Sequence, residues 1–508
     1  MHDKKRAIAG LSAVSVITIT AFPFLVTSLS YQFIGAPADE THIAWLGKQV
    51  AAGRIPYRDF FSFLPPAASV LAALPAWLFG PGLVPLRLFV GALILFASLA
   101  LYSIARTRGA TRSWAVIVAL WLPLVIFPLW PVATHHWFAI CLGLGCLAVI
   151  AQRPLRPGGA VMAGALASLA GLVNQSVGLV LGVLFVAALF SRPASRGVRL
   201  LGMAGLLAIP AIFGSWLATE GALESGLRQF ILWPLRYYRQ PGGFNDVVSS
   251  EFFSVIPSKI SLSFAGADAF ACGVVFILTI ATLLLLATEL LARSRRLREP
   301  QDWKLDALIL ALSAFAFSRS RIDFVHLALW TPFVLPVISR YAAGQVAPLQ
   351  RAAARTLLVA GILVSIARFA PHWREEPPSA HRLFDTDRRL SAYVRSTVLG
   401  VLPGVLEASE PVVLLSWSGS VLYLYWSPAY PPVDWIHAPS AHFTSPDHYA
   451  MMAEFIDTNR VRYVIVDGDA IDELQGAPTP IRDLLLSRYS PFRDTPYGRA
   501  FRRRTGPG

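Results

Sequence analysis

The sequence predicts a mainly α-helical, polytopic membrane protein of about eleven transmembrane helices with a small C-terminal extracytoplasmic α/β domain. Three observations support this fold class. The 508 residues are 55% hydrophobic and only 15% charged, whereas soluble globular proteins carry roughly a quarter charged residues. Long apolar runs alternate with short basic clusters. From about residue 371, charged residues, prolines and histidines become frequent, which predicts a separate domain of different composition.

Apolar runs of about 20 residues are long enough to cross the bilayer as helices. The first run follows the basic head MHDKKR and is longer than the core of a cleaved signal peptide, so we expect an uncleaved span. The run 159–191 is too long for one span, and its break at Asn174 and Gln175 predicts a hairpin of two short helices. The expected spans are 7–30, 84–105, 113–130, 133–151, 159–173, 176–191, 200–218, 267–291, 304–318, 327–343 and 356–369.

The arginines between the spans predict the orientation of the chain. Starting with the N-terminus in the cytoplasm, each connection expected on the inside is basic, as the positive-inside rule requires. The first outer loop, 31–83, and the chain after 370 then lie on the outer face of the plasma (inner) membrane. The expected inside connections are 106–112, 152–158, 192–199, 292–303 and 344–355.

The chain divides into a membrane domain, 1–370, and an outer domain, 371–508. In the outer domain, the apolar stretches 410–419 and 461–469 predict two buried strands. Between them, Ser445 and Pro446 have the residue types of an N-cap and a first helical position, which predicts a helix. Strand, helix and strand in this order predict a small α/β fold.

Composition also excludes some functions. The net charge of +14 could indicate nucleic-acid binding, but the basic residues lie in the connections between spans, where they act as orientation signals. The three cysteines all lie in apolar runs and have no metal-binding spacing, so we expect neither disulfides nor a cysteine metal site. The chain contains no nucleophile elbow, P-loop or HExxH motif.

Two adjacent carboxylates, Asp39 and Glu40, follow the first span directly. They could be ordinary loop residues, but the same outer segment continues through Tyr57, Arg58 and Asp59 to an apolar, proline-flanked stretch, PPAASVLAALPAWLFG. That stretch is short for a crossing and suits a helix at the membrane interface. We interpret the acidic pair as a general base at the outer membrane surface, with Tyr57, Arg58 and Asp59 as candidate substrate-binding residues.

Two further polar pairs are expected on the outer side. His135 and His136 lie at the turn before the fourth span, where they could be interfacial or could bind phosphate. Adjacent histidines on a helix point apart, so a two-histidine metal site is disfavoured. Asn174 and Gln175, at the tip of the predicted hairpin, could cap its helices or line a cavity.

A fourth cluster, SRSRIDFVH, lies between the ninth and tenth spans. Ionisable residues at membrane depth are costly and usually functional, and the arginine fork suits phosphate. Snorkelling to lipid headgroups is the alternative. We expect the cluster to bind an anion, and its members are Arg319, Arg321, Asp323 and His326.

A carboxylate base, cations for a phosphate and an apolar helix bundle together suit glycosyl transfer from a lipid-linked phosphate donor. The carboxylate would take the proton of an acceptor hydroxyl, and arginines would stabilise charge on the departing phosphate. The carboxylates of Asp39, Glu40 and Asp59 are also hard oxygen ligands, so the sequence is compatible with the binding of a divalent metal ion. No other cofactor is indicated.

These residues resemble the GT-C membrane glycosyltransferases, closest to the bacterial relatives of protein O-mannosyltransferases and lipid A aminoarabinose transferases. The resemblance is carried by the outer-loop acidic pair, PYRDFF and PP, the late Arg-x-Asp-x-x-His stretch and the C-terminal α/β domain. It implies an inverting enzyme with a polyprenyl-phosphate sugar donor, Asp39 as catalytic base and Glu40 as second acid. Thr41 stands where the family usually has glycine, so the acceptor (glycan, lipid or protein) stays open.

The sequence is also compatible with three other functions. A lipid-linked oligosaccharide ligase or polymerase would also use outer arginines and histidines, but it would not need Asp39. A lipid or glycolipid transporter would carry charges deep in several spans, whereas most predicted spans have uncharged interiors. A scaffold would use the outer domain for partner binding alone.

Overall fold

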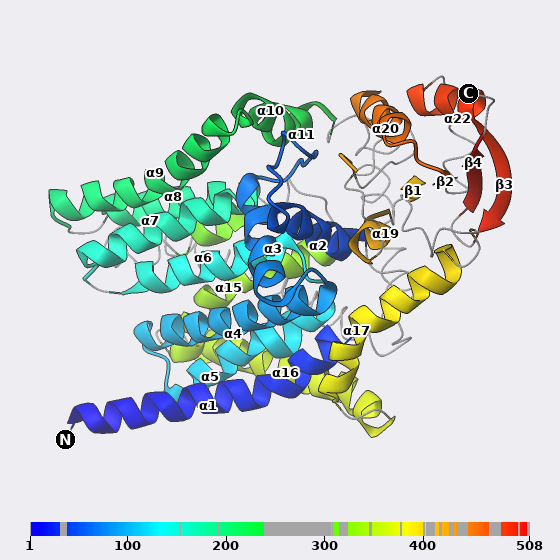
Figure 1. Cartoon of the computed structure of the whole chain (residues 1–508). Coiled ribbons are helices and arrows are strands. Elements are labelled where there is room, and N and C mark those ends of the chain that lie inside the picture. Colours follow the sequence, from blue (N-terminus) through cyan, green and yellow to red (C-terminus); the bar gives the residue numbers. More distant parts are fainter. Residues whose placement is uncertain are drawn as a thin grey trace.

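The computed structural model describes residues 2–30, 38–152, 154–191, 194–237, 306, 308–313, 324–344, 348–375, 378–399, 402, 412–415, 419–425, 431–433, 446–466, 479–495 and 498–504. The predicted span 267–291 lies outside these residues, as does most of 304–318. The described part forms a bundle of long helices joined to a small α/β domain (Figure 1). This confirms a mainly helical protein with a small C-terminal α/β domain, while the expected number of eleven spans stays a prediction.

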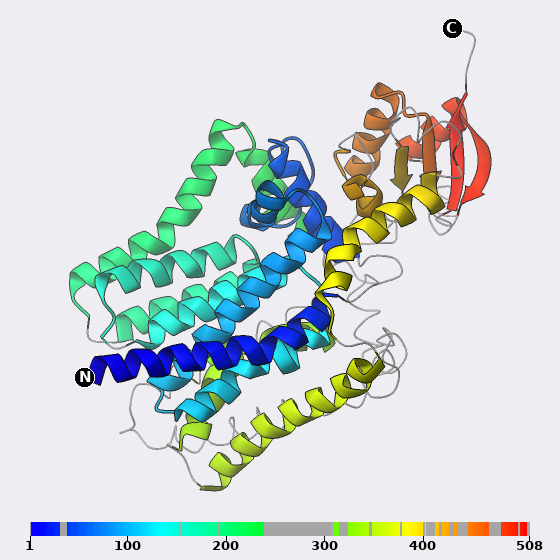
Figure 2. The same cartoon turned by 60° about the horizontal axis from the view of Figure 1, so that its bottom comes forward.

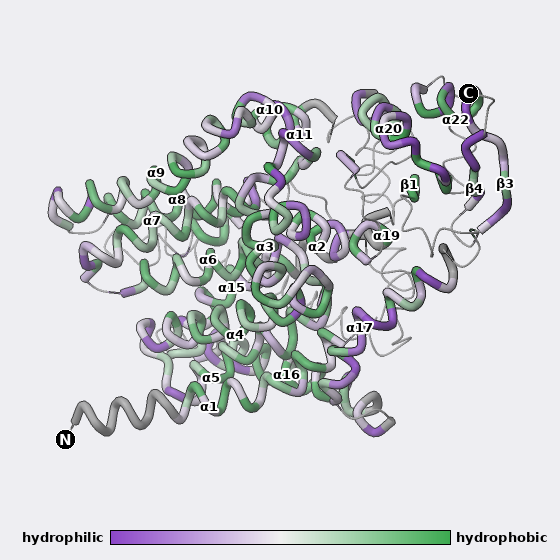
Figure 3. The backbone as a smooth tube through the Cα atoms, viewed as in Figure 1, coloured by the Kyte–Doolittle hydropathy of each residue, from purple (hydrophilic) through white to green (hydrophobic). Residues whose placement is uncertain are grey.

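Each expected span that the structure describes in full is helical. Figure 3 shows that hydrophobic residues predominate along the helices of the bundle and that hydrophilic residues are frequent in the outer domain. Within the described residues, five helices are long and apolar enough to cross a membrane, and several apolar helices are shorter. The bundle consists of α1 (His2–Leu29), α4 (Leu83–Thr107), α5 (Arg112–Trp121) with η1 (Leu122–Ile126) and η2 (Phe127–Leu129), α6 (His135–Ala151), α7 (Pro157–Gly171), α8 (Gln175–Ser191), α9 (Arg196–Thr219), α15 (Phe324–Ala343) and α16 (Pro348–Glu375).

The predicted hairpin is formed by α7 and α8, and its break falls at residues 172–174. The two helices approach so closely that a Cβ added to Gly178 would overlap the backbone of Gly171. Small residues at such contacts let helix backbones pack directly where lipid supplies no hydrophobic driving force. The two helices therefore pack backbone against backbone near the tip of the hairpin.

The first outer loop contains two helices. The apolar stretch predicted to be an interface helix is α3 (Pro66–Phe79), which begins with proline at its first position. The other helix, α2 (Ala38–Ala51), was not predicted from the sequence. Asp39 and Glu40 occupy the first turn of α2, where negative charge interacts favourably with the helix dipole. Gly47 of α2 packs against the backbone of Ala72 in α3, which leaves no room for a Cβ.

A second outer segment follows α9 and contacts the first. It comprises α10 (Leu223–Leu227), η3 (Arg228–Leu232) and α11 (Trp233–Tyr237). Tyr57 of the first loop packs against this segment, with its ring centroid 5.6 Å from that of Phe230. The two outer segments therefore form one continuous structure above the bundle.

The outer domain is built on a four-stranded sheet of order β1-β2-β4-β3. Strands β1 and β2 pair in parallel, and all their residues are buried, which confirms the two predicted strands. The predicted helix between them is α20, which begins at Pro446. The antiparallel hairpin β3–β4 was not anticipated. The elements are α17 (Ala380–Tyr393), η4 (Val394–Leu399), β1 (Val412–Leu415), α19 (Gly419–Tyr425), α20 (Pro446–Thr458), β2 (Tyr463–Val466), α22 (Pro480–Arg488), β3 (Tyr489–Thr495) and β4 (Gly498–Arg503).

The sheet is covered on both faces. Helices α20 and α22 pack on one face, in a cluster that also includes Phe61 from the first outer loop and Trp233. Tyr463 of β2 and Tyr423 of α19 belong to the core on the other side, which is continuous with that of the bundle. Figure 2 shows α17 leading from the bundle to the sheet. The outer domain therefore packs on the outer loops rather than being joined only by a linker.

Candidate functional site

The first turn of α2 places the two adjacent carboxylates in different environments. The side chain of Asp39 is exposed, whereas Glu40 is only 1% exposed. Successive helical residues point about 100° apart, so one faces the outer surface and the other faces the bundle. Of the two adjacent acids, only Asp39 is therefore accessible at the surface of the protein.

Glu40 is bound by Arg87 of α4, which is 4% exposed. Nε and Nη2 of Arg87 donate hydrogen bonds of 2.8 and 2.7 Å to the two carboxylate oxygens of Glu40. Nη1 of Arg87 donates to the carbonyl of Leu29 at the end of α1. The backbone N–H of Ala133, just before α6, donates to Glu40 Oε1. Glu40 and Arg87 thus join α1, α2, α4 and the segment before α6.

Tyr57, Arg58 and Asp59 hold the loop between α2 and α3. The Tyr57 hydroxyl donates to the carbonyl of Leu64, and Tyr57 has a positive φ of 71°. Arg58 forms ion pairs of 2.9 Å with Asp59 and with Glu220 after α9. The hydrogen bonds from Arg58 keep the pKa of Asp59 below its ordinary value. These contacts connect the two outer segments.

The two polar pairs predicted on the outer side meet at the tip of the hairpin. Nδ2 of Asn174 lies 3.2 Å from Nδ1 of His136, and the rings of His135 and His136 have centroids 4.1 Å apart. Oδ1 of Asn174 accepts from the N–H of Val177, so Asn174 caps α8. Gln175 donates to the carbonyl of Phe230 in η3.

The late cluster falls largely outside the described residues. Arg319, Arg321 and Asp323 lie outside them, and His326 lies in the first turn of α15, where the structure does not describe its side chain. Their expected role in phosphate binding stays a prediction. Among the described side chains, no group of three His, Cys, Asp or Glu residues is placed to hold a metal ion.

Sequence reasoning missed three residues that shape this site. Arg87 is an arginine inside the predicted span 84–105, and its position at membrane depth was the signal that could have identified it. Lys48, in the last turn of α2, donates to the carbonyls of Tyr423 and Leu424 in α19. Asp387 of α17 accepts from the N–H groups of Leu83 and Val84 at the start of α4. No local pattern marks the last two residues.

The sequence matches no protein-family model and no curated protein sequence. Solved structures do resemble the chain. ArnT from Cupriavidus metallidurans bound to undecaprenyl phosphate is 16% identical, with a TM-score of 0.55 over 97% of this chain and 99% of that one. The apo structure of the same protein gives 16% identity and a TM-score of 0.54 over 97% and 98%.

A weaker likeness is found with the oligosaccharyltransferase AglB from Archaeoglobus fulgidus in complex with an inhibitory peptide and a dolichol-phosphate. It is 11% identical, with a TM-score of 0.49 over 98% of this chain and 75% of that one. The likeness to ArnT extends over nearly the full length of both chains and therefore shows the fold. The chain has the GT-C fold, as the sequence resemblance implied.

Proposed function

We propose that the protein is an integral membrane glycosyltransferase that moves a sugar from a polyprenyl-phosphate donor to an acceptor hydroxyl on the outer face of the membrane. The proposal rests on the difference in burial between the two adjacent acids. Asp39 is exposed in the first turn of α2, while the neighbouring Glu40 is buried against Arg87. The GT-C fold and the undecaprenyl phosphate bound by ArnT support the class of donor.

In this mechanism Asp39 is the general base. Its carboxylate takes the proton of the acceptor hydroxyl as the oxygen attacks the anomeric carbon, and the bond from that carbon to the carrier phosphate breaks. Attack from the face opposite the phosphate inverts the anomeric centre. The carrier phosphate is a weak base, so it departs without a general acid. The Glu40 carboxylate is already bound by Arg87, so its proposed role is to position Asp39.

The cations for the carrier phosphate are proposed from the sequence. Arg319 and Arg321 supply charge that stabilises the departing phosphate. His136, held by Asn174 at the hairpin tip, is proposed as a hydrogen-bonding residue for donor or acceptor. The outer domain would hold the acceptor, which the sequence leaves open among glycan, lipid and protein. The arginine-rich connections support a cytoplasmic N-terminus and an outer domain outside the plasma membrane.

The test uses purified protein in nanodiscs with a panel of radiolabelled polyprenyl-phosphate hexoses and pentoses. We compare the wild type with Asp39→Asn, which keeps the shape of the side chain and removes the base. We expect the variant to lose at least about a hundredfold in turnover, which is the lower end of general-base contributions. Donor binding, measured separately, should stay unchanged because Asp39 acts on the acceptor.

A matched control is Asp447→Asn. Asp447 is also an exposed aspartate in the first turn of a helix, α20, but it lies on the outer domain. It should leave turnover unchanged. Equal turnover in wild type and Asp39→Asn would reject Asp39 as base and favour a ligase that relies on the late arginines. Transport of an intact labelled glycolipid into proteoliposomes, without transfer, would favour a transporter.

A further inference from the structure

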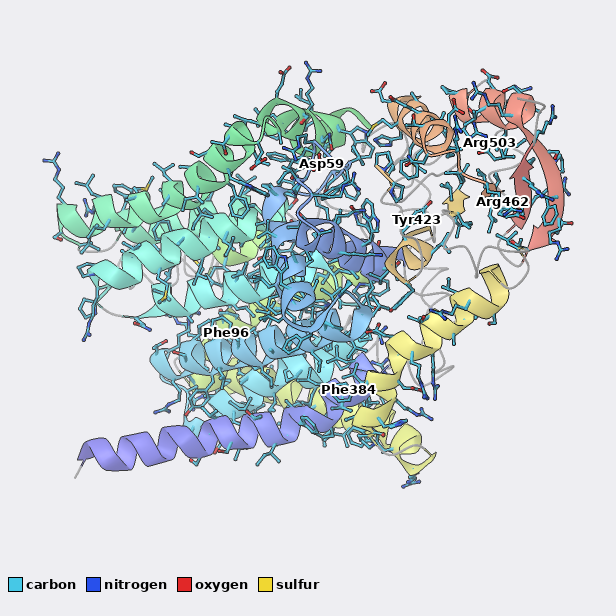
Figure 4. The ribbon with its side chains drawn as sticks, viewed as in Figure 1. Asp59, Phe96, Phe384, Tyr423, Arg462 and Arg503 are labelled. Carbon is cyan, nitrogen blue, oxygen red and sulfur yellow. The ribbon has the colours of Figure 1, made fainter. Side chains whose placement is uncertain are left out.

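In helix α19, Tyr423 contacts both the outer sheet and helix α2. The phenol oxygen of Tyr423 lies 3.1 Å from both the backbone nitrogen and the carbonyl oxygen of Leu414 in β1. Its own carbonyl accepts a hydrogen bond of 2.6 Å from Nζ of Lys48. Tyr423 is labelled in Figure 4, on α19 between α2 and β1. This buried residue therefore contacts the strand with its side chain and α2 with its main chain.

Lys48 occupies a favourable place for a cation. It donates to Tyr423 and also, over 3.3 Å, to the carbonyl of Leu424, and both residues lie in the last turn of α19. The last carbonyls of a helix have no intrahelical donors, and the dipole gives that end partial negative charge. Desolvation by burial opposes this attraction and lowers the pKa of Lys48 to about 8.

The same helix is attached to α4. The hydroxyl of Tyr425 donates a 2.5 Å hydrogen bond to Asp387, whose carboxylate accepts from the N–H groups of Leu83 and Val84. These are the first residues of α4, the helix whose Arg87 binds Glu40. Helix α19 is thus bonded directly to α2, which carries both acids, and through Asp387 to α4.

We propose that α19 transmits the position of the outer domain to Asp39, with Lys48 as the positioning residue. The proposal rests on the proposed function, because it takes Asp39 as the base. Asp39 and Lys48 lie at opposite ends of α2, about 13 Å apart along its axis. A helix of this length moves as a rigid rod, so a shift at Lys48 displaces the first turn. The outer domain would then both hold the acceptor and determine the position of Asp39, the base that acts on the acceptor.

Other contacts keep the outer domain attached when Lys48 is changed. The N–H of Phe61 donates to the carbonyl of Pro432 at 2.7 Å. The rings of Phe61 and His448 have centroids 3.9 Å apart, and Trp233 packs against both. Substitution of Lys48 should therefore alter the placement of α2 without releasing the outer domain.

The experiment compares full-length wild type with Lys48→Met, which keeps the apolar stem and removes the donors, and Lys48→Arg, which retains charge and donors. Hydrogen exchange by mass spectrometry follows α2 and α19, and turnover is measured at saturating labelled donor. In Lys48→Met we expect faster exchange in both helices, a kcat lower by about tenfold and an unchanged KM for the donor. Lys48→Arg should restore most of the kcat.

The control is Arg228→Met, which removes an exposed cation paired with Glu224 on the same side of the molecule. It should leave exchange in α2 and turnover at the wild-type level. Faster exchange in Lys48→Met with unchanged kcat would overturn the coupling but leave glycosyl transfer standing. Unchanged exchange would overturn the role of Lys48. If the wild type turns over no donor, the proposed function fails, and exchange alone decides whether Lys48 positions α2.

Discussion

The two oxygens of the Glu40 carboxylate are held by Nε and Nη2 of a single arginine, Arg87, at 2.8 and 2.7 Å. Both side chains are almost fully buried. Bidentate pairs of this kind fix orientation as well as distance. The carboxylate beside Asp39 is therefore part of the framework of the site, which gives the first prediction.

Removal of one partner of this pair should be more damaging than removal of both. Glu40→Gln leaves the Arg87 charge buried without its carboxylate, and we expect a loss of about 3–5 kcal/mol in unfolding free energy. The double variant Glu40→Gln, Arg87→Met should lose less than Glu40→Gln alone, and therefore less than the sum of the single variants. Thermal unfolding in detergent, followed for the four proteins of this cycle, measures the coupling. Additive losses would mean that the pair contributes little beyond its separate contacts.

The stability of the protein should rise with pH between about 8 and 10.5 through Lys48. The pKa of Lys48 is lowered to about 8 by burial, from an ordinary value of 10.5. Between these values the unfolded chain binds a proton that the folded chain lacks, so stability increases with pH across this window and the gain is absent below pH 8. The gain is of order 1–3 kcal/mol after allowance for solvent screening.

The measurement compares melting temperature against pH for wild type and Lys48→Met. As the pH rises from 8 to 10.5, the melting temperature of the wild type should increase relative to that of Lys48→Met. Tyrosines that titrate in the same range are common to both proteins and cancel in the difference. A pH-independent difference would show that Lys48 is charged equally in the folded and unfolded states.

Asn174 should determine the tautomer of His136. Oδ1 of Asn174 accepts from Val177, so its Nδ2 donates to Nδ1 of His136, and the neutral imidazole carries its proton on Nε2. Asn174→Asp keeps the cap of α8 but presents an acceptor to Nδ1, so the proton should move to Nδ1. Nitrogen NMR of labelled histidine reports the change.

A capping control separates the two roles of Asn174. Asn174→Ala removes the cap as well as the histidine contact and should cost about 1 kcal/mol of stability, whereas Asn174→Asp should cost less. Equal histidine spectra in wild type and Asn174→Asp would contradict the assignment of the tautomer.

The hairpin of α7 and α8 offers a matched pair of glycine substitutions. Gly178→Ala places a Cβ into the backbone of Gly171, whereas Gly182, one turn further along α8, has open space at the corresponding position. We expect Gly178→Ala to lower stability by at least about 1–3 kcal/mol through overpacking, and Gly182→Ala to be neutral or slightly stabilising. Melting temperatures of both variants in the same detergent provide the test; similar values would mean that the helices separate freely.

The sequence predicted the helices and the two parallel strands well because their signals are local. Apolar runs such as 84–105 and 200–218 must form helices in lipid, since every backbone polar group has to be satisfied within the segment. VVLL and YVIV are short β-branched and leucine runs typical of buried strands. Helix α2 was not predicted because its acidic first turn has the composition of an outer loop.

The candidate site was predicted only in part. Asn174 and His136 were each identified, but the contact between them follows from how α6 and the hairpin pack. Arg58 and Asp59 were also identified, and the structure pairs Arg58 both with Asp59 and with Glu220. Residue types indicated which side chains could carry chemistry, while distant partners such as Glu220 could not be identified from any local pattern.

The sequence by itself determined the membrane-spanning helices, the outer strands and the location of the acidic pair after the first span, because hydropathy and charge act on neighbouring residues. Only the tertiary structure decided that Arg87, 47 residues away, binds Glu40, and that Tyr423, 375 residues away, accepts from Lys48. Those pairings depend on which helix ends meet when the bundle and the outer domain pack. The physical reason is that a buried charge or terminal carbonyl takes whichever partner the packing brings within hydrogen-bonding distance.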